Sequence, residues 1–595
     1  MQKVSQSWIE NQNRTLVGES FVEVALDIAD PEALADTSSE DNGAVYISDT
    51  SQIVSEVDKV IAPYATLEQN LWLLDGSRKT LPLSNFDDCG FIGDVLSDST
   101  STFSTKTPMI TVNFTRVHHN LIPAVTITWG TAYNEFAEDF IVTAYNGNNR
   151  VAEKEVIGNK DVTSVVEMDI VDYDRITVNI LRWCLPCRRA RIEEIFVGMH
   201  KVYTKTDFFS YTHSQTVDPI SASLPKAEVS FSIDNVDNSY NPYNSNGMAK
   251  YLMERQEIKT RYGYKYDDGS VEWIKGGTFY LSEWDAPQNG IQAHFKARDL
   301  LEFMSGIFYE GLYNPNGTSL YFLALQLLNK ANLPLNSDGT VKWVIDESLK
   351  SIYTTAPLPL DTLANNLQLI ANASGCVLYQ DRNGTLHLEP ISNTVTDYAI
   401  TLKNSYSKSD VALSKPLQQV NVVAYQYFGE DKTSELYKGV VAINGTTEMW
   451  ITYSNMALSA NATVSDGTLV SAEYYTNACK LTITGSGSVT VLVEGVVLKS
   501  SKTDVVICSG LSGEIVSVDN PLITDRDRAL IVGEIAEAHL KNRMSVTSSW
   551  RADPRLDALD IVTNTNEYNS NNVRMTDVKF TYNGAFRGTG EGRVM

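Results

Sequence analysis

Cys184 and Cys187 have the spacing of a metal-binding or redox-active cysteine pair. Two thiolates separated by two residues supply half of a structural zinc site. The second half is missing, because the sequence has no other such pair and the nearest histidine is His200. A redox-active pair normally starts a helix, whereas this one lies between predicted strands. We therefore interpret it as a tight turn, with zinc binding and redox chemistry as the alternatives.

Three carboxylates near the end of the chain, Asp553, Asp557 and Asp560, have residue types that suit general acid and base catalysis. Arg551 and Arg555 stand beside them on a predicted β-turn. We interpret the three carboxylates as ion-paired structural groups, because adjacent arginines neutralise them.

The remaining candidate ligands do not form a metal site. His118 and His119 are adjacent, so on a strand they point to opposite faces and cannot readily bind one ion, and we expect them in a loop. Residues 234–246 are rich in Asp and Asn but lack the glycine at the sixth position and the glutamate at the twelfth that an EF-hand needs. Asx turns are the better interpretation. The sequence thus predicts no catalytic residue, no metal and no cofactor.

Residues 86–200 alternate apolar and polar side chains in six predicted strands, which is compatible with a jelly roll. Its last segment, residues 189–198, resembles the final strand of galactose-binding, discoidin-like domains. The resemblance implies sugar binding through loops at one end of the sandwich, where aromatic faces stack on the sugar ring. Trp129, Tyr133 and Trp183 are the candidate glycan contacts; the alternative is that the tryptophans belong to the core.

The elements that must position these residues are mostly strands. Residues 227–297 contain five short strand patterns separated by turn signals, which predict a small antiparallel barrel or sandwich. Amphipathic helices are expected at residues 319–332 and 360–373, the second ended by Gly375. Asn383 and Gly384 predict a tight hairpin turn. A helix of about 19 residues follows Thr524 and Asp527, which stand at capping-box spacing.

Several of these segments together resemble the hub and tail-tip proteins of phage tails and tail-like particles. They are the strand, turn and Ala297-Arg298-Asp299 exit of residues 227–311, the segment at residues 64–77, the helix, glycine and DRNG hairpin of residues 360–390, and the strands at residues 550–562 and 580–588. The resemblance covers about two thirds of the chain.

The resemblance implies a mainly β fold with α+β elements, containing two hub β-barrels, a small helix-hairpin domain, an inserted β jelly roll and a second small β insertion. The predicted order is residues 1–85 and 201–315 for the first barrel, 86–200 for the jelly roll, 316–400 for the α+β middle domain, 401–432 and 518–595 for the second barrel, and 433–517 for the small insertion.

The resemblance also implies a function. Three subunits with two similar barrels each would form a ring that joins hexameric tail rings to a trimeric tip or spike. The expected partners are the distal tail ring, tape measure and tip, spike or receptor-binding proteins. A host cell-wall glycan is a further partner if the jelly roll binds sugar. We expect assembly in the host bacterial cytoplasm and a final location at the tip of the virion tail.

Composition agrees with this class and excludes others. The 595 residues, of which 43% are hydrophobic, suggest roughly four folded domains. A net charge of −25 opposes general nucleic-acid binding, which depends on Lys and Arg. Such charge either lines a conduit that lets DNA slide past or only aids solubility. Six scattered cysteines fit a reducing compartment, and we expect neither a secretory signal nor a membrane-spanning helix.

The sequence leaves two alternatives to a non-enzymatic hub. A tail-associated peptidase or glycan hydrolase usually has its catalytic domain after the hub, but no Ser, Cys or Glu here lies in a recognisable hydrolase motif. A bacterial carbohydrate-binding adhesin is the second alternative, against which the expected absence of a signal and anchor counts.

Overall fold

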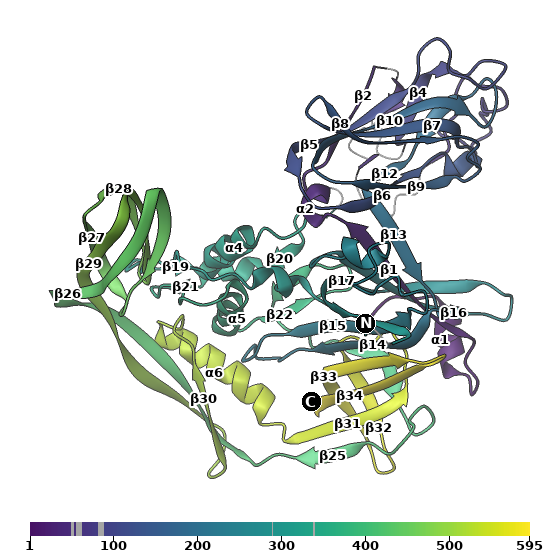
Figure 1. Ribbon diagram of the computed structural model, residues 1–595. Coiled ribbons are helices and arrows are strands. Elements are labelled where there is room, and N and C mark those ends of the chain that lie inside the picture. The colour runs from purple at the N-terminus through teal and green to yellow at the C-terminus, as the bar shows by residue number, and fades with distance from the viewer. Residues whose placement is uncertain (44, 49–52, 55–61, 81–88, 288–289, 337–339) are drawn as a thin grey trace.

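The computed structural model describes residues 1–595 except residues 44, 49–52, 55–61, 81–88, 288–289 and 337–339 (Figure 1). Strands hold 52% of the residues and helices 12%, so the prediction of a mainly β protein is confirmed. Figure 1 shows a large central sheet with a β insertion above it and a long β arm at the opposite side. In the part of the chain that is described, no helix has the length and apolar character needed to cross a bilayer.

One sheet of thirteen strands replaces the two predicted barrels. β14 pairs with β15 on one side and with β33 on the other, so the strands of the first predicted barrel continue into those of the second. Among the described strands the sheet does not close on itself, which corrects the expectation of two closed barrels. In order across the sheet the main path is β13 (Gly198–Tyr203), β1 (Ser20–Ala29), β16 (Glu257–Lys265), β17 (Val271–Asp285), β18 (Gln292–Arg298), β15 (Lys226–Asp234), β14 (Phe208–Thr216), β33 (Ser570–Tyr582), β34 (Phe586–Val594), β31 (Met544–Arg551) and β25 (Asp410–Leu413), with β32 (Ile561–Thr565) and β24 (Val395–Ile400) branching from β33.

A single apolar core lies under both halves of this sheet. Alternate residues of β15, Val229, Phe231 and Ile233, are buried in it, as their period of two predicts. Trp550 and Phe580 from the C-terminal half belong to the same cluster. The core therefore fixes the two halves of the sheet as one body.

The insertion leaves the sheet at the end of β1 and returns at the start of β13. Ala29 and Gly198 are register partners, and a Cβ atom on Gly198 would lie 2.7 Å from the Ala29 Cβ atom, so only glycine fits this crossing.

Within the insertion, a five-stranded and a three-stranded sheet share one core and form a sandwich. β2, which precedes residue 86, belongs to this sandwich. The strands are β2 (Ser38–Asp41), β5 (Met109–His118), β10 (Tyr173–Trp183), β7 (Ala137–Asn146) and β8 (Asn149–Val156); β12 (Glu194–Phe196), β6 (Ile122–Thr128) and β9 (Thr163–Ile170); and, in a third sheet, β11 (Arg189–Ile192), β4 (Phe91–Leu96) and β3 (Val45–Ser48).

The middle domain contains the two predicted helices. In α4 (Leu320–Ala331) the Ser319 hydroxyl accepts a hydrogen bond from the Phe322 amide at 3.3 Å, which caps the first turn. α5 (Leu363–Ser374) ends at Gly375, whose φ of 66° lies in the left-handed region. The predicted hairpin is β22 (Val377–Gln380) and β23 (Leu386–Glu389), which pairs with β20 (Trp343–Ile345).

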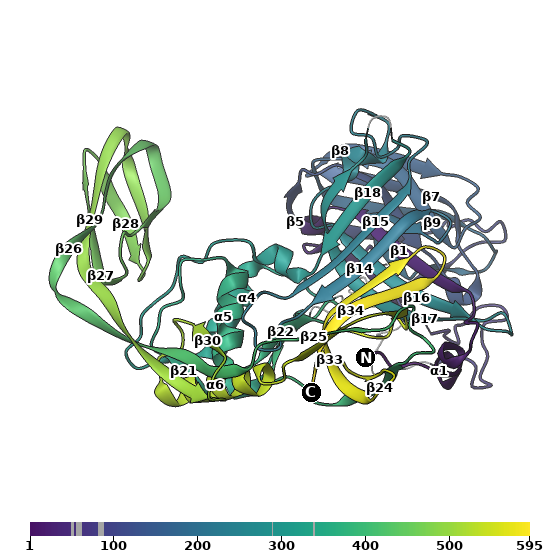
Figure 2. The same ribbon diagram turned by 90° about the horizontal axis from the view of Figure 1, so that it is seen from below.

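A long hairpin forms the arm. β26 (Leu417–Thr452) and β29 (Ala478–Cys508) pair along almost their whole length, and β27 (Ala457–Ser465) and β28 (Thr468–Tyr474) add to its far end (Figure 2). β30 (Glu514–Asp519) returns beside β26, and α6 (Arg526–Leu540) contacts β26 and β29. The Asp525 carboxylate caps α6, which corrects the predicted Thr524 and Asp527 capping box.

The short remaining elements connect these parts. They are α1 (Gln6–Asn13), α2 (Pro31–Leu34), β19 (Thr318–Ser319), β21 (Tyr353–Thr354) and the 3-10 turns η1 (Thr131–Tyr133), η2 (Met248–Tyr251), η3 (Leu300–Met304) and η4 (Glu347–Ser351).

Candidate functional site

The tryptophans predicted as glycan contacts are buried in the sandwich core. Trp129 and Trp183 have no solvent-exposed surface, and their rings meet edge to face with centroids 6.1 Å apart. Trp129 Nε1 donates to Ser164 Oγ at 2.8 Å, and Trp183 Nε1 donates to Glu135 Oε2 at 3.0 Å. With both ring faces enclosed, neither tryptophan can stack on a sugar, so the core alternative holds for these two.

Tyr133 lies outside that core, but both its hydroxyl and its ring contact other residues of the chain. Its hydroxyl donates to the Tyr64 carbonyl at 3.0 Å, and the guanidinium groups of Arg191 and Arg78 lie 4.5 and 5.0 Å from its ring centroid. These contacts fasten the segment at residues 64–77 to the sandwich. The three predicted glycan residues are therefore not brought together into one open aromatic surface.

The cysteine and histidine pairs serve local structure. Cys187 has a φ of 57° in a turn, and burial raises the pKa of the Cys184 thiol, whose sulfur accepts the Phe136 amide. His118 is buried in β5 with Nε2 3.0 Å from Asp36, whereas exposed His119 contacts Asp172. His119 lies just after the end of β5, as expected for a loop residue, but the expectation that His118 lies in a loop is wrong. The described residues contain no group of three or more His, Cys, Asp or Glu placed to hold a metal ion.

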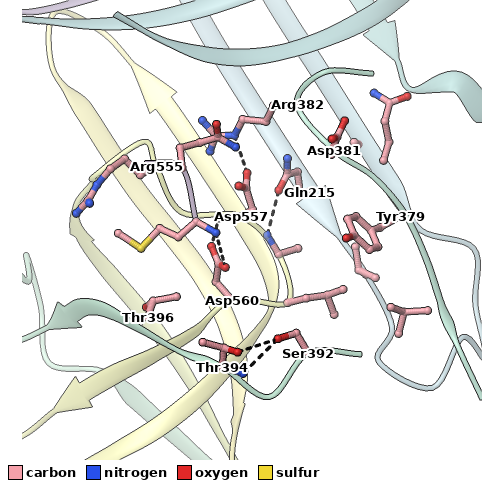
Figure 3. A pocket seen from close by; sticks show the side chains of 18 of the residues that line it. Gln215, Tyr379, Asp381, Arg382, Ser392, Thr394, Thr396, Arg555, Asp557 and Asp560 are labelled. Atoms are coloured by element: carbon pink, nitrogen blue, oxygen red, sulfur yellow. Dashed lines mark hydrogen bonds and ion pairs between the residues drawn. The ribbon is translucent and has the colours of Figure 1, made fainter. Parts of the chain in front are cut away.

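A pocket of about 770 Å³ lies where distant segments of the chain meet (Figure 3). Its walls come from residues 1–4, from β14 and the residues after it, from the β22 and β23 hairpin with the residues that follow it up to Asp397, and from residues 555–560. Carboxylates, arginines and hydroxyl groups line it, among them Tyr379, Ser392, Thr394 and Thr396.

Two of the three C-terminal carboxylates, Asp557 and Asp560, line this pocket, and each of the three contacts a cation. Asp553 is fully buried 2.7 Å from Arg555, as the ion-pair interpretation predicts. Asp560 accepts from the Met1 ammonium at 2.7 Å, and burial, with the adjacent Asp557 carboxylate, raises the pKa of Asp560. Arg551 instead donates to main-chain carbonyl groups such as that of Gln12 at 2.8 Å.

Arg382 connects three of the segments that meet at the pocket. Its guanidinium donates to Asp557 Oδ1 at 2.6 Å, to the Lys275 carbonyl at 2.9 Å and to the Leu556 carbonyl at 3.0 Å. It comes from the DRNG turn, 175 residues before Asp557. Sequence reasoning missed this residue because the pairing spans domains, although an arginine inside a tight turn was the available signal.

A second charged cluster stiffens the hairpin behind the pocket. The Tyr379 ring stacks on His387 with centroids 5.0 Å apart, and its hydroxyl donates to Glu389 at 2.7 Å. Burial opposes the charged imidazole, but Asp381, 3.4 Å away, and Glu389, 3.8 Å away, together outweigh it and raise the pKa of His387. Tyr379, Asp381, His387 and Glu389 therefore contact one another within the hairpin itself.

No protein-family model matches the chain, and no curated protein matches it. Among solved structures it is similar to the 43 kDa tail protein of prophage MuSo2 from Shewanella oneidensis, at 11% identity over 66% of this chain and 95% of that chain, with a TM-score of 0.36. It is similar to the tail protein from Neisseria meningitidis MC58 at 9% identity, over 66% and 93% of the chains, with a TM-score of 0.37. It is also similar to prophage tail protein gp18 from Listeria monocytogenes EGD-e at 11% identity, over 67% and 91%, with a TM-score of 0.36. These three are tail proteins, which is the class that the sequence motifs resemble.

Proposed function

We propose that this protein is a non-enzymatic structural component of a phage tail or tail-like particle, the hub at its distal end. Three copies form a ring that connects the tail rings to the tip or spike, and DNA passes through its centre. Its partners are the distal tail ring, tape measure and tip proteins. The insertion faces outward, where it contacts either another tail protein or a host glycan.

The Arg382 junction is the observation that carries this proposal. Three of the segments that resemble tail hubs are far apart in the sequence: residues 227–311, the DRNG hairpin and residues 550–562. Arg382 joins all three, because it comes from the hairpin and binds the Lys275 carbonyl and residues 556–557. The three segments that resemble tail hubs are therefore held together as one structural unit, to which the insertion and the arm are attached.

A hub of this kind must resist force along the tail. The buried ion pairs at the junction fit such a role, since a buried charge that loses its partner is strongly disfavoured. Among the described strands, the thirteen-stranded sheet also ends in edges that no further strand pairs with, and neighbouring subunits can cover such edges.

Negative-stain electron microscopy of the purified protein tests the proposal. We expect ring-shaped particles with a central hole and threefold symmetry, with the insertions and arms projecting from the rim. Isolated single-chain particles without rings, under the conditions in which the protein is folded, contradict the proposed hub.

A further inference from the structure

The sequence contains eight Asn-Gly pairs, a dipeptide prone to deamidation. The amide nitrogen of the glycine attacks the side-chain carbonyl carbon of the asparagine, because glycine has no side chain to hinder the approach. The pairs begin at Asn42, Asn146, Asn246, Asn289, Asn316, Asn383, Asn444 and Asn583. All but Asn289 belong to the described part of the chain, so the environments of seven pairs can be compared.

Hydrogen bonds or strand pairing restrain six of these seven glycines. Five of their amides donate a hydrogen bond: Gly43 to Asp41 Oδ1 at 2.6 Å, Gly147 to Asp174 Oδ2 at 2.8 Å, Gly247 to the Asn244 carbonyl at 2.9 Å, Gly317 to the Asn314 carbonyl at 2.9 Å and Gly384 to the Asp381 carbonyl at 3.1 Å. Gly445 lies within β26, opposite Gly485 of β29. An amide that donates must lose its hydrogen bond before it attacks, so the fold slows the reaction at these pairs.

Asn583 and Gly584 have neither restraint. With Ala585 they form the exposed loop between β33 and β34, and the Gly584 φ of 85° lies in the left-handed region. Within the described structure, the Gly584 amide donates no hydrogen bond and the Asn583 side chain makes none. A Cβ atom on Gly584 would meet nothing within 4 Å, so the loop has room to bring the amide nitrogen to the Asn583 Cγ atom.

Asn146 and Gly147 provide a matched comparison within the same chain. They also occupy a hairpin turn, between β7 and β8, and the Gly147 φ of 57° is again left-handed. A Cβ atom on Gly147 would likewise meet nothing within 4 Å. The two turns differ at the glycine amide, because that of Gly147 donates to Asp174 and that of Gly584 does not donate.

We propose that Asn583 deamidates first among the described Asn-Gly pairs of the folded protein. The Gly584 amide loses its proton to hydroxide and its nitrogen bonds to Asn583 Cγ. The bond from Cγ to Nδ2 then breaks, and the departing nitrogen takes a proton from water and leaves as ammonia. Water opens the resulting succinimide at either carbonyl, which gives aspartate or isoaspartate. This modification site goes beyond the proposed hub function and does not depend on it.

The new carboxylate lies where the β33–β34 hairpin meets the start of β1. Ser20 Oγ donates to the Gly584 carbonyl at 3.4 Å, and the Tyr582 hydroxyl donates to the Ser20 carbonyl at 2.7 Å. Glu19, the residue before Ser20, already brings a negative charge that acts on Tyr582. A second negative charge, and in isoaspartate an additional main-chain carbon, therefore weakens the contact between this hairpin and β1.

Peptide mapping by mass spectrometry, after incubation of the folded protein at mildly alkaline pH, tests the proposal. The Asn583 peptide is expected to convert to the acid about fivefold faster than the Asn146 peptide or more, since that is the factor that one hydrogen bond of average strength supplies. Labelled methyl transfer by protein isoaspartyl methyltransferase identifies the isoaspartate. Asn583→Gln is expected to abolish the signal at this loop, because the longer side chain would have to close a larger ring.

Two controls show whether the fold sets this order. Asp174→Ala removes the acceptor of the Gly147 amide and is expected to speed conversion of Asn146, whereas Asp174→Asn keeps an acceptor oxygen and is expected to leave it slow. In urea, where the fold is lost, Asn583 and Asn146 are expected to convert at similar rates.

The deamidated protein itself provides the remaining measurement. It carries one more negative charge, so anion exchange separates it from the unmodified chain. The amides of residues 19–22 are expected to exchange with deuterium faster in this fraction, and exchange at the unmodified rate overturns the weakened contact with β1.

Two results overturn the assignment of Asn583. The first is conversion of Asn583 in the folded protein no faster than that of Asn146 or of another described Asn-Gly pair. The second is an excess of Asn583 conversion that persists in urea, because sequence neighbours rather than the fold would then set the order.

Discussion

Replacing Arg382 with leucine tests whether the junction holds the molecule together. The Arg382 side chain is 2% exposed and donates three hydrogen bonds, one of them to the Asp557 carboxylate at 2.6 Å. Removing one partner of a buried ion pair costs about 3–5 kcal/mol when the other charge stays fully desolvated and unpaired. The Asp557 side chain is 22% exposed, so we expect Arg382→Leu to lower the free energy of opening of the β22 and β23 hairpin by about 3 kcal/mol, the lower end of that range.

Native-state hydrogen exchange at residues 377–389 measures this free energy locally, which a single melting curve of a large protein does not. The matched control is Arg14→Leu, which breaks an exposed pair with Asp267 at 2.9 Å, where the arginine side chain is 51% exposed. The control is expected to change stability by less than about 1 kcal/mol. If Arg382→Leu protects the hairpin amides as well as the control does, the reasoning about the junction is refuted.

Three other perturbations follow from the same contacts. Glu68→Gln leaves the buried Arg191 with only the Glu135 carboxylate, 3.5 Å away, as an anionic partner, so we expect a loss of about 1–3 kcal/mol and faster proteolytic cleavage within residues 64–79. Trp450→Ala removes the stack on Tyr309, whose ring centroid is 4.8 Å away, so small-angle scattering should show a larger radius of gyration as the arm moves more freely; an unchanged radius would contradict this. Burial lowers the pKa of His213 to about 3, below its value of about 6.5 in an unfolded chain. The unfolded state therefore binds the proton more readily, and stability is lost as pH falls from about 6.5 towards 3. His213→Gln should reduce the difference in melting temperature between pH 7 and pH 4.5. An unchanged difference would show that His213 does not cause the loss of stability at low pH.

Local patterns in the sequence predicted local structure well. The two helices of the middle domain, the glycine that ends the second one, and the Asn383-Gly384 turn are set by residues close in sequence, and the structure confirms each. The strands of the insertion follow the predicted alternation for the same reason. Capping was less predictable, because Thr524, Asp525 and Asp527 are all suitable caps and only the observed geometry selects Asp525.

Local sequence patterns could not predict which distant strands pair with each other. The alternation of β14 shows that one face is buried, but it does not reveal that β33, more than 350 residues later, pairs with its second edge. Two separate barrels and one continuous sheet give the same pattern along each strand. The partner of Arg382 was hidden for the same reason.

Burial prevents two of the three predicted glycan-binding residues from reaching a sugar. A tryptophan at the end of a strand faces either a binding loop or the core, and its sequence neighbours do not distinguish the two. Trp129 and Trp183 face the core because their rings fill the space between the two sheets and their indole nitrogens have internal acceptors.

The mass of the purified protein in solution tests the central claim most directly. Light scattering across a range of protein concentrations is expected to give one main species of about 198 kDa, the mass of three chains of 66.0 kDa. A species of 66.0 kDa at every concentration would contradict the account of this protein as a ring-forming tail hub.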